Sequence, residues 1–259
     1  MIIPGMVSAT FRDKSAERIL TLCRQAGLSA VEWSENAHVF PGDRRGSEQL
    51  YEKTRDAGLL VAAYGSYYRL GEYQDPEAVF LRTAESAAAL KAPVIRIWAG
   101  TRPSAAVGEE EFVRLAGEAA AVAQIASDYG MKAAFEWHKD TLTDTNQSAA
   151  RLLHAAGHDN LYCLWQPTAA LTMEERLCGL DLLSDRILNL HIYYWKNGEK
   201  RPLEEGKEKW LQYLKHVDRT VPRYGLLEFV RNAAEEQFLE DAAALHRILG
   251  EMQAEYGKE

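Results

Sequence analysis

Four residues whose side chains can bind a metal ion stand at similar points in the second half of the chain. Glu136, Gln166, His191 and Glu228 each end a short apolar segment, with gaps of 30, 25 and 37 residues between them. Two carboxylates, one imidazole and one amide oxygen form a donor set that suits Mn²⁺, Mg²⁺, Co²⁺ or Zn²⁺. Taken singly, each residue has a simpler interpretation, such as a helix cap, a loop ion pair or a hydrogen-bonded core histidine. Two buried carboxylates beside a histidine are costly without a cation, so we interpret the four as a metal site.

The elements that must position these residues follow one repeating pattern. Short apolar segments alternate with longer amphipathic segments rich in Ala, Leu, Glu and Arg. The predicted strands are 3–10, 30–33, 60–64, 94–98, 132–136, 161–166, 187–192 and 224–229. The predicted helices are 15–26, 47–57, 76–90, 109–129, 145–156, 172–183, 210–216 and 235–249.

Turn and capping signals support these boundaries. Glycine follows several predicted helix ends, as at Gly27 and Gly157, where it can adopt the left-handed conformation that ends a helix. Asp75 precedes a proline at a helix start, and Thr172 with Glu175 has the form of a capping box.

Eight strand–helix units in one chain predict an α/β fold, a single (β/α)₈ TIM barrel that spans residues 1–259 as one domain. The alternative is a doubly wound open sheet, which needs fewer strands and usually a glycine-rich phosphate loop. Neither GxGxxG nor GxxxxGK[ST] occurs in the sequence. No linker or low-complexity segment divides the chain.

In such a barrel the active site lies at the carboxyl ends of the strands. Five of the six tryptophans fall at this rim, namely Trp33, Trp98, Trp137, Trp165 and Trp195. Aromatic rings around a concavity suit the apolar faces of a sugar. The simpler explanation for any one of them is that it closes the top of the barrel. The clustering of five nevertheless predicts a carbohydrate pocket.

Composition excludes several other classes of function. The formal net charge is −8 and the isoelectric point is about 5.5, which disfavours binding to nucleic acid or to an anionic membrane. The three cysteines, Cys23, Cys163 and Cys178, contain no CxxC pair and indicate a reducing, cytoplasmic compartment. The sequence shows no signal peptide and no apolar run long enough to span a bilayer, so we expect neither.

The residues around the four candidate ligands resemble those of the sugar isomerase/epimerase superfamily with a xylose-isomerase-like barrel. That superfamily includes ketose 3-epimerases, hydroxypyruvate isomerases and inosose dehydratases and, more distantly, metal-dependent apurinic-site endonucleases. The resemblance covers essentially the whole chain in strand order. The motifs that carry it are Ala134-Phe135-Glu136-Trp137-His138, Leu164-Trp165-Gln166-Pro167, Asn189-Leu190-His191-Ile192 and Leu226-Leu227-Glu228-Phe229. In the family's epimerases the matching positions hold Glu, Asp, His and Glu, which bind one divalent metal.

Gln166 departs from that pattern, because the family implies an aspartate at this position. An amide oxygen still coordinates a hard cation but brings no charge, so we expect weaker metal binding and a more Lewis-acidic ion. The alternative is that Gln166 contacts only the substrate and water completes the coordination. The endonuclease branch fits poorly, because no histidine ends the third or fourth predicted strand and the chain is acidic.

The resemblance implies a divalent-metal-dependent isomerase or epimerase of a small carbohydrate, working through a metal-bound enediolate. Glu136 and Glu228 would then be both metal ligands and the acid/base pair. Two alternatives stay open. The first is a metal-dependent dehydratase or lyase that acts on a keto-sugar or cyclitol. The second is a non-catalytic sugar-binding barrel, which the replacement at Gln166 suggests.

Four further residues are predicted to contact the substrate: His138, Trp98, Tyr64 and Arg231. Arg96 lies inside a buried strand and needs a partner, for which Glu32 is a candidate. Cations in the rim loops suit a carboxylate or phosphate on the substrate; they are Arg12, Arg69, Arg102, Lys196 and Arg231. The expected partner is a small carbohydrate, and a homo-oligomer is expected from the resemblance alone.

Overall fold

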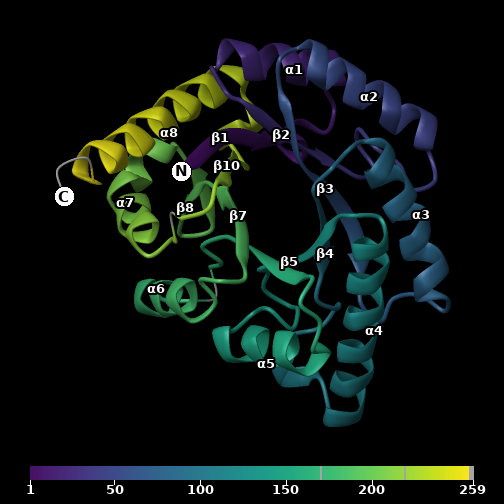
Figure 1. Cartoon of the computed structure of the whole chain (residues 1–259). Coiled ribbons are helices and arrows are strands. Elements are labelled where there is room, and N and C mark those ends of the chain that lie inside the picture. Colours follow the sequence, from purple (N-terminus) through teal and green to yellow (C-terminus); the bar gives the residue numbers. More distant parts are fainter. Residues whose placement is uncertain (170, 219, 257–259) are drawn as a thin grey trace.

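Eight parallel strands close into a barrel in the computed structural model, which describes residues 1–169, 171–218 and 220–256 (Figure 1). The order around the barrel is β1-β10-β7-β6-β5-β4-β3-β2. The barrel strands are β1 (Ile2–Val7), β2 (Ala30–Ser34), β3 (Leu60–Arg69), β4 (Val94–Trp98), β5 (Lys132–Glu136), β6 (Leu161–Trp165), β7 (Ile187–Ile192) and β10 (Arg223–Leu227).

A helix follows each barrel strand and packs on the outside of the barrel. The helices are α1 (Ala16–Gln25), α2 (Arg44–Asp56), α3 (Pro76–Ala89), α4 (Glu109–Asp128), α5 (Asn146–Ala156), α6 (Met173–Leu182), α7 (Lys207–Lys215) and α8 (Glu235–Tyr256). Figure 1 shows α8 beside α1, so the last helix completes the outer ring where the chain began. The predicted (β/α)₈ barrel is therefore confirmed.

The predicted helix ends have the local chemistry that the sequence indicated. Thr172 caps α6 with its hydroxyl oxygen, which accepts from the Glu175 backbone N–H, and the Glu175 carboxylate accepts from the Thr172 N–H. Asp75 caps α3 in front of a proline. Gly157 ends α5 with a φ of 60°, which is the left-handed conformation that glycine adopts without strain.

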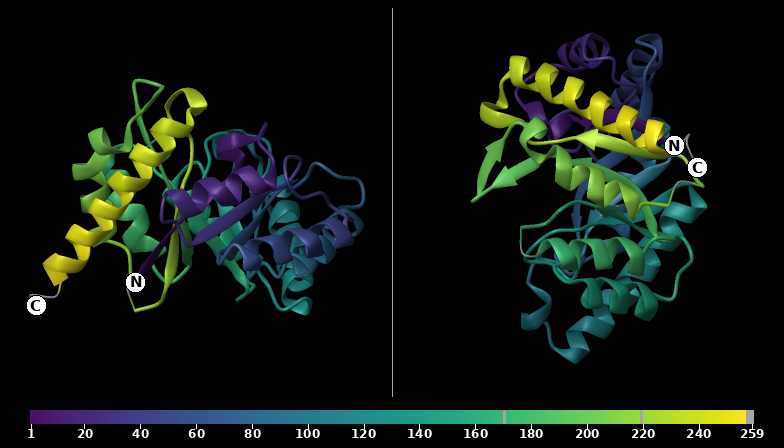
Figure 2. Two further views of the ribbon diagram at one scale, coloured as in Figure 1. Left: turned by 90° about the horizontal axis from the view of Figure 1, so that it is seen from above. Right: turned by 90° about the vertical axis from the view of Figure 1, so that its left-hand side faces the viewer.

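Several predicted boundaries differ from the structure. Helix α8 runs to Tyr256 instead of residue 249, and α2 and α7 each begin three residues earlier than predicted. Three further differences concern the strands. The first strand ends at Val7, and residues Ser8–Phe11 form a 3₁₀ turn, so the predicted extension to residue 10 is wrong. Strand β3 is longer than predicted and runs to Arg69 through a shift in its register with β4. The third difference is a two-stranded hairpin of β8 (Tyr194–Lys196) and β9 (Glu199–Arg201), green in Figure 2, which projects from the barrel.

Short 3₁₀ turns complete the connections between these elements. They are η1 (Ser8–Phe11), η2 (Ser104–Ala106), η3 (Leu203–Gly206) and η4 (Arg231–Ala233). In the described part of the chain, no helix combines the length and the apolar character that crossing a membrane requires.

The barrel interior is layered, and the alternation of side chains along each strand creates the layers. Small and aliphatic side chains fill the lower layer; they are Val7, Ala30, Ala62, Ala63, Val94, Ala134, Leu164 and Leu226. Residues two positions further along a strand point to the same side of the sheet. The next layer up therefore receives Glu32 above Ala30, Arg96 above Val94 and Glu136 above Ala134, and these residues are buried as well. An apolar floor thus supports a charged layer near the carboxyl ends of the strands.

Candidate metal centre and active site

The charged layer brings the four predicted metal ligands together. Glu136 ends β5, His191 lies in β7, and Gln166 and Glu228 follow directly after β6 and β10. All four side chains are buried. One ligand atom from each of Glu136, His191 and Glu228 lies within 4.8 Å of the other two, and these three residues form a group able to hold a metal ion. Gln166 adjoins the group, since its Nε2 donates to Glu136 Oε1 over 3.2 Å.

The Glu32 carboxylate fixes the orientation of the His191 ring. Its Nε2 lies 3.0 Å from Glu32 Oε2, within hydrogen-bonding distance. Its Nδ1 faces the other two carboxylates, 3.5 Å from Glu136 Oε1 and 3.4 Å from Glu228 Oε2, and has no hydrogen-bond partner. A carboxylate accepts the proton of one ring nitrogen and thereby leaves the lone pair of the other for a metal. Nδ1 is therefore the ring atom that points into the site.

The contacts of Gln166 identify which of its two terminal side-chain atoms is nitrogen and which is oxygen. Its Nε2 lies 2.6 Å from the backbone carbonyl oxygen of Trp137, which can only accept a hydrogen bond. The amide oxygen must consequently be the other atom. Gln166 Oε1 is buried and has no hydrogen-bond partner. This carbonyl oxygen is available as a neutral ligand.

Arg96 lies inside the same layer and connects two of its carboxylates. Its Nη1 lies 2.5 Å from Glu136 Oε2, and its Nε lies 3.3 Å from Glu32 Oε1. The predicted pairing of Arg96 with Glu32 is confirmed. Gly65 on β3 makes room for this pair, because a Cβ atom there would stand 2.7 Å from Glu32 Oε1.

Burial and neighbouring charges shift the pKa values of Glu136 and Glu228, the two candidate catalytic carboxylates, in opposite directions. Burial alone raises the pKa of Glu136, but the Arg96 guanidinium and His191 outweigh it and hold that pKa below its ordinary value. Burial raises the pKa of Glu228, and the nearby Glu136 carboxylate adds to the rise. Burial lowers the pKa of His191, yet Glu32 and Glu228 together hold it well above its ordinary value. Glu228 is thus the more basic of the two carboxylates.

The residues present fit a divalent cation. Three of the candidate ligands each have a buried polar atom without a hydrogen-bond partner: His191 Nδ1, Gln166 Oε1 and Glu228 Oε2. The atoms of His191 and Glu228 lie 3.4 Å apart. Leaving such atoms unpaired in a protein interior costs about 1–3 kcal/mol each. A divalent ion held by Glu136, His191 and Glu228 would satisfy the buried atoms of His191 and Glu228 and would offset the negative charge that Arg96 does not neutralise. Imidazole, carboxylate and amide oxygen are ligands that Zn²⁺, Mn²⁺ and related ions accept.

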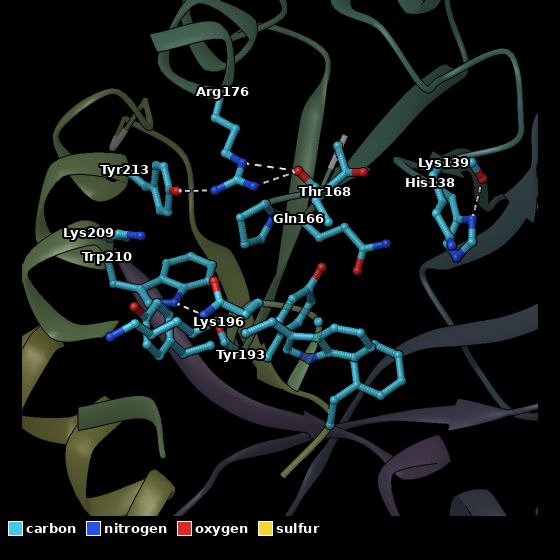
Figure 3. A pocket seen from close by; sticks show the side chains of 17 residues that line it. His138, Lys139, Gln166, Thr168, Arg176, Tyr193, Lys196, Lys209, Trp210 and Tyr213 are labelled. Carbon is cyan, nitrogen blue, oxygen red and sulfur yellow. Dashed lines mark hydrogen bonds between the residues drawn. The ribbon is translucent and has the colours of Figure 1, made fainter. Parts of the chain in front are cut away.

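A pocket opens beside this group. Its volume is about 660 Å³, which lies in the usual range for small-molecule sites. Figure 3 shows Gln166 near its centre, His138 and Lys139 on one side, and Lys209 and Trp210 on the other. The lining residues are His138, Lys139, Gln166, Pro167, Thr168, Ala169, Arg176, Tyr193, Tyr194, Trp195, Lys196, Asn197, Gly198, Lys209, Trp210, Tyr213 and Phe229.

The four predicted substrate contacts occupy different places. His138 lines the pocket. Trp98 is half-buried and stacks against the His138 ring, with 4.3 Å between the ring centroids. Tyr64 is fully buried on β3 beside the Glu35 carboxylate. Arg231 is exposed in η4, outside the residues that line the pocket.

The predicted ring of five tryptophans is wrong as a description of the pocket wall. Only Trp195 of the five belongs to the described lining. Trp33 points outward, and its Nε1 donates to Thr54 on α2. Trp137 and Trp165 are buried in the core, where Trp165 packs against Trp210.

The walls of the pocket come largely from residues that the sequence analysis did not assign to the site. The hairpin of β8 and β9 supplies Tyr194 and Trp195, and its Asn197-Gly198 turn was the available signal for it. Trp210 and Tyr213 come from α7, and Arg176 comes from α6. No local pattern marks these helical residues as pocket residues.

Phe229 follows Glu228 and lies in an unusual backbone conformation. Its φ is 58°, a value that residues other than glycine rarely adopt. The turn places its ring against those of Tyr193 and Trp195 in the pocket wall. Strained residues of this kind concentrate at functional sites.

Comparison with known proteins places this arrangement in a family. The inosose dehydratase of Clostridium perfringens is 22% identical over 234 residues, which cover 84% of this chain and 77% of that protein. The crystal structure of the probable 3-DHS dehydratase AsbF from Bacillus anthracis superposes with a TM-score of 0.78 at 18% identity, over 95% of this chain and 99% of that one. An L-ribulose 3-epimerase structure gives a TM-score of 0.76 at 15% identity, over 99% and 97%.

A family model covers most of the chain and agrees with both the barrel and the resemblance seen in the sequence. The model, described as xylose isomerase-like TIM barrel, matches residues 20–248. The chain therefore belongs to the xylose isomerase-like TIM barrel family.

Proposed function

We propose that this protein is a divalent-metal-dependent enzyme that removes a proton from the carbon beside a carbonyl group of a small carbohydrate. The observation that carries the proposal is the arrangement of His191. Its Nδ1 is buried and faces the carboxylates of Glu136 and Glu228 at 3.5 and 3.4 Å, and its Nε2 is held by Glu32. A side chain held in this way is built to coordinate a metal rather than to fill a core.

Glu136, Gln166, His191 and Glu228 would hold the ion at the edge of the pocket. A bound divalent ion polarises a substrate carbonyl and makes the adjacent C–H group more acidic. Gln166 belongs both to the donor set and to the pocket lining, so a substrate in the pocket lies next to the ion-binding group.

Glu228 is the residue that we assign as the base. Its Oε2 makes no hydrogen bond, and its pKa is raised by burial. Glu136 is unsuited to the same task, because Arg96 and Gln166 engage its two oxygens. The proton passes from the substrate carbon to Glu228, and the electron pair of the C–H bond forms the double bond of an enolate.

This inequality of the two glutamates supports dehydration of a keto-sugar or cyclitol. One base suffices for that reaction, because the proton on Glu228 can protonate the β-hydroxyl group, which leaves as water when its C–O bond breaks. The similarity to an inosose dehydratase and to a probable 3-DHS dehydratase agrees with this choice.

Isomerisation or epimerisation is the second candidate. It returns the proton to carbon instead of expelling water, and in the two-base form it needs both carboxylates free. The observation that favours it is that Glu136 and Glu228 both face His191 Nδ1, so that both adjoin one ion. The similarity to an L-ribulose 3-epimerase supports the same view.

Incorporation of deuterium from the solvent distinguishes dehydration from epimerisation. The metal-loaded protein is incubated in D₂O with ketoses and with keto-cyclitols, and the products are followed by proton NMR and mass spectrometry. Dehydration gives loss of water and a conjugated ultraviolet chromophore, whereas epimerisation gives deuterium on carbon without loss of water. We expect Glu228→Gln to stop both signals and the exposed control Glu110→Gln to leave them unchanged. Equal proton exchange in Glu228→Gln and wild type would overturn the assignment of the base.

A further inference from the structure

The pocket beside the metal-binding group carries a charge opposite to that of the chain. Four cationic side chains stand among its described lining residues: Lys139, Arg176, Lys196 and Lys209. No aspartate or glutamate belongs to that described lining. The whole chain has a formal net charge of −8, so a cationic pocket does not follow from the composition.

Arg176 is the centre of this charge, and its neighbours hold it without neutralising it. Its Nε and Nη2 donate to the backbone carbonyl of Thr168 over 3.1 and 2.8 Å, and its Nη1 donates to the Tyr213 hydroxyl over 3.1 Å. Both acceptors are uncharged, and Arg176 forms no ion pair with any carboxylate of the described residues. Figure 3 shows these contacts at the edge of the pocket.

These three hydrogen bonds leave part of the guanidinium free. An arginine side chain has five N–H donors, so one N–H remains on each terminal nitrogen. The contacts with Thr168 and Tyr213 also fix the plane of the guanidinium. A half-buried cation with a fixed plane and two free donors is suited to a planar carboxylate or to a phosphate.

Two of the three lining lysines, Lys196 and Lys209, strengthen the same preference, whereas Lys139 lies 4.0 Å from the Asp140 carboxylate. Lys209 lies over the ring of Tyr194 at 5.4 Å, which keeps its ammonium group near the pocket wall. Neither Lys196 nor Lys209 forms an ion pair with a described carboxylate. Two of the other rim cations named from the sequence are engaged elsewhere, because Arg102 pairs with Glu111 and Arg69 lies over Trp98.

Aromatic rings form the opposing wall. Tyr193, Trp195 and Phe229 pack edge to face or tilted against one another, with ring centroids 5.4 to 5.8 Å apart. Such a wall accepts the apolar face of a ring and leaves its hydroxyl groups to polar partners.

Building on the proposed function, we propose that the substrate is an anionic carbohydrate or cyclitol whose carboxylate or phosphate group binds Arg176. Gln166 and Arg176 both line the pocket, so the reacting end of the substrate lies by the metal-binding group and the anion lies by α6. The shared chemistry is a negative group on a polyhydroxylated ring. Binding measurements with both kinds of anion distinguish a carboxylate from a phosphate.

Paired ligands that differ in charge test the proposal by binding alone. Isothermal titration calorimetry on the metal-loaded protein compares D-glucuronate and D-glucose 6-phosphate with D-glucose, and quinate with myo-inositol. We expect an anion to bind about tenfold or more tightly than its neutral partner, as a charge-assisted contact provides, and the better anion identifies the source. Arg176→Gln should remove most of this preference and leave neutral ligands unaffected.

Two further variants distinguish a specific loss of anion binding from a general loss of folding. Lys209→Gln should reduce the anion preference by a smaller factor, whereas Arg55→Gln, a surface control paired with Asp56, should leave it unchanged. Equal affinity for charged and neutral ligands, no anion binding at millimolar concentration, or a uniform loss in Arg176→Gln would overturn the proposal. Anion binding without any deuterium exchange would instead contradict the proposed function and leave the anion site standing.

Discussion

Glu32 Oε2 lies 3.0 Å from Nε2 of His191, and the two residues belong to strands that are not neighbours in the barrel. Strands β1 and β10 separate β2 from β7, so the contact crosses the barrel interior. It turns Nδ1 of the imidazole toward Glu136 and Glu228. The geometry of the proposed metal centre therefore depends on a residue that is not itself a candidate ligand.

Replacing Glu32 should weaken metal binding without removing a ligand. In Glu32→Gln the imidazole loses its charged acceptor, which both lowers ligand basicity and frees the ring to rotate. We expect metal affinity to fall by about 10–100-fold, as is typical when the partner of a ligating histidine is changed. Competition titration with a chelating dye measures this affinity. Glu52→Gln, exposed on α2, is the control, and an unchanged affinity in Glu32→Gln would argue against the orienting role.

Arg96 should be a large contributor to the stability of the metal-free protein. Its side chain is buried and pairs with Glu136 and Glu32. Arg96→Met leaves two buried carboxylates uncompensated, so we expect the free energy of unfolding to fall by about 3–5 kcal/mol in urea titrations.

Divalent metal should reduce this loss, because a bound ion compensates Glu136 in place of the guanidinium. The stability difference between Arg96→Met and wild type is therefore expected to shrink at saturating Zn²⁺ or Mn²⁺. Arg55→Met, at the surface, is the matched control. A difference that is small without metal, or that metal does not change, would show that the layer is held in another way.

Gln166→Asp should increase metal affinity. The amide oxygen of Gln166 is neutral, whereas an aspartate adds a third negative charge to Glu136 and Glu228. Coordination of a divalent cation strengthens with ligand charge, so we expect tighter binding in the chelator competition. Gln166→Leu removes the donor and should weaken binding. If both variants bind metal as the wild type does, Gln166 is not a ligand.

The free energy of unfolding should depend on pH because the pKa of Glu35 is raised in the folded protein. Burial raises the pKa of this carboxyl from 4.5 to about 7, against opposing contacts from Tyr67 and Arg96. The folded state therefore binds this proton more tightly than the unfolded state does. Its stabilising contribution is fully present below pH 4.5 and is lost as the pH rises to about 7.

Comparison with Glu35→Gln isolates this effect. The unfolding free energy of the metal-free wild type, relative to that of the variant, should decline across this range by at most about 3 kcal/mol, the value that such a shift in pKa allows. Urea unfolding at a series of pH values measures both proteins. Parallel profiles would mean that Glu35 titrates normally in the folded state.

Much of the architecture could be predicted from sequence because the fold repeats one local rule. Each strand–helix unit shows its own periodicity and capping, as at Thr172 and Gly157, so the eight units are visible without long-range information. Glu136 and His191 were found because each stands near the carboxyl end of a strand, where such barrels place their active sites.

The contacts that the sequence did not predict form across the barrel or depend on which way a helix faces. The approach of Glu32 to His191 cannot be read from neighbouring strands, because two other strands lie between theirs. Arg176 resembles any surface arginine of an amphipathic helix until the loop that contains Thr168 is folded against it. Trp33 and Trp165 stand near strand ends in sequence, but their rings pack away from the pocket.

The metal content of the purified protein shows whether Glu136, His191 and Glu228 form a metal centre. Elemental mass spectrometry after loading and buffer exchange compares the wild type with His191→Ala and with His216→Ala, a histidine on the surface beside Asp181. We expect close to one divalent ion per chain in the wild type and in His216→Ala, and none in His191→Ala. A folded wild type that retains no metal, or a His191→Ala variant that retains as much as the wild type, would contradict this expectation.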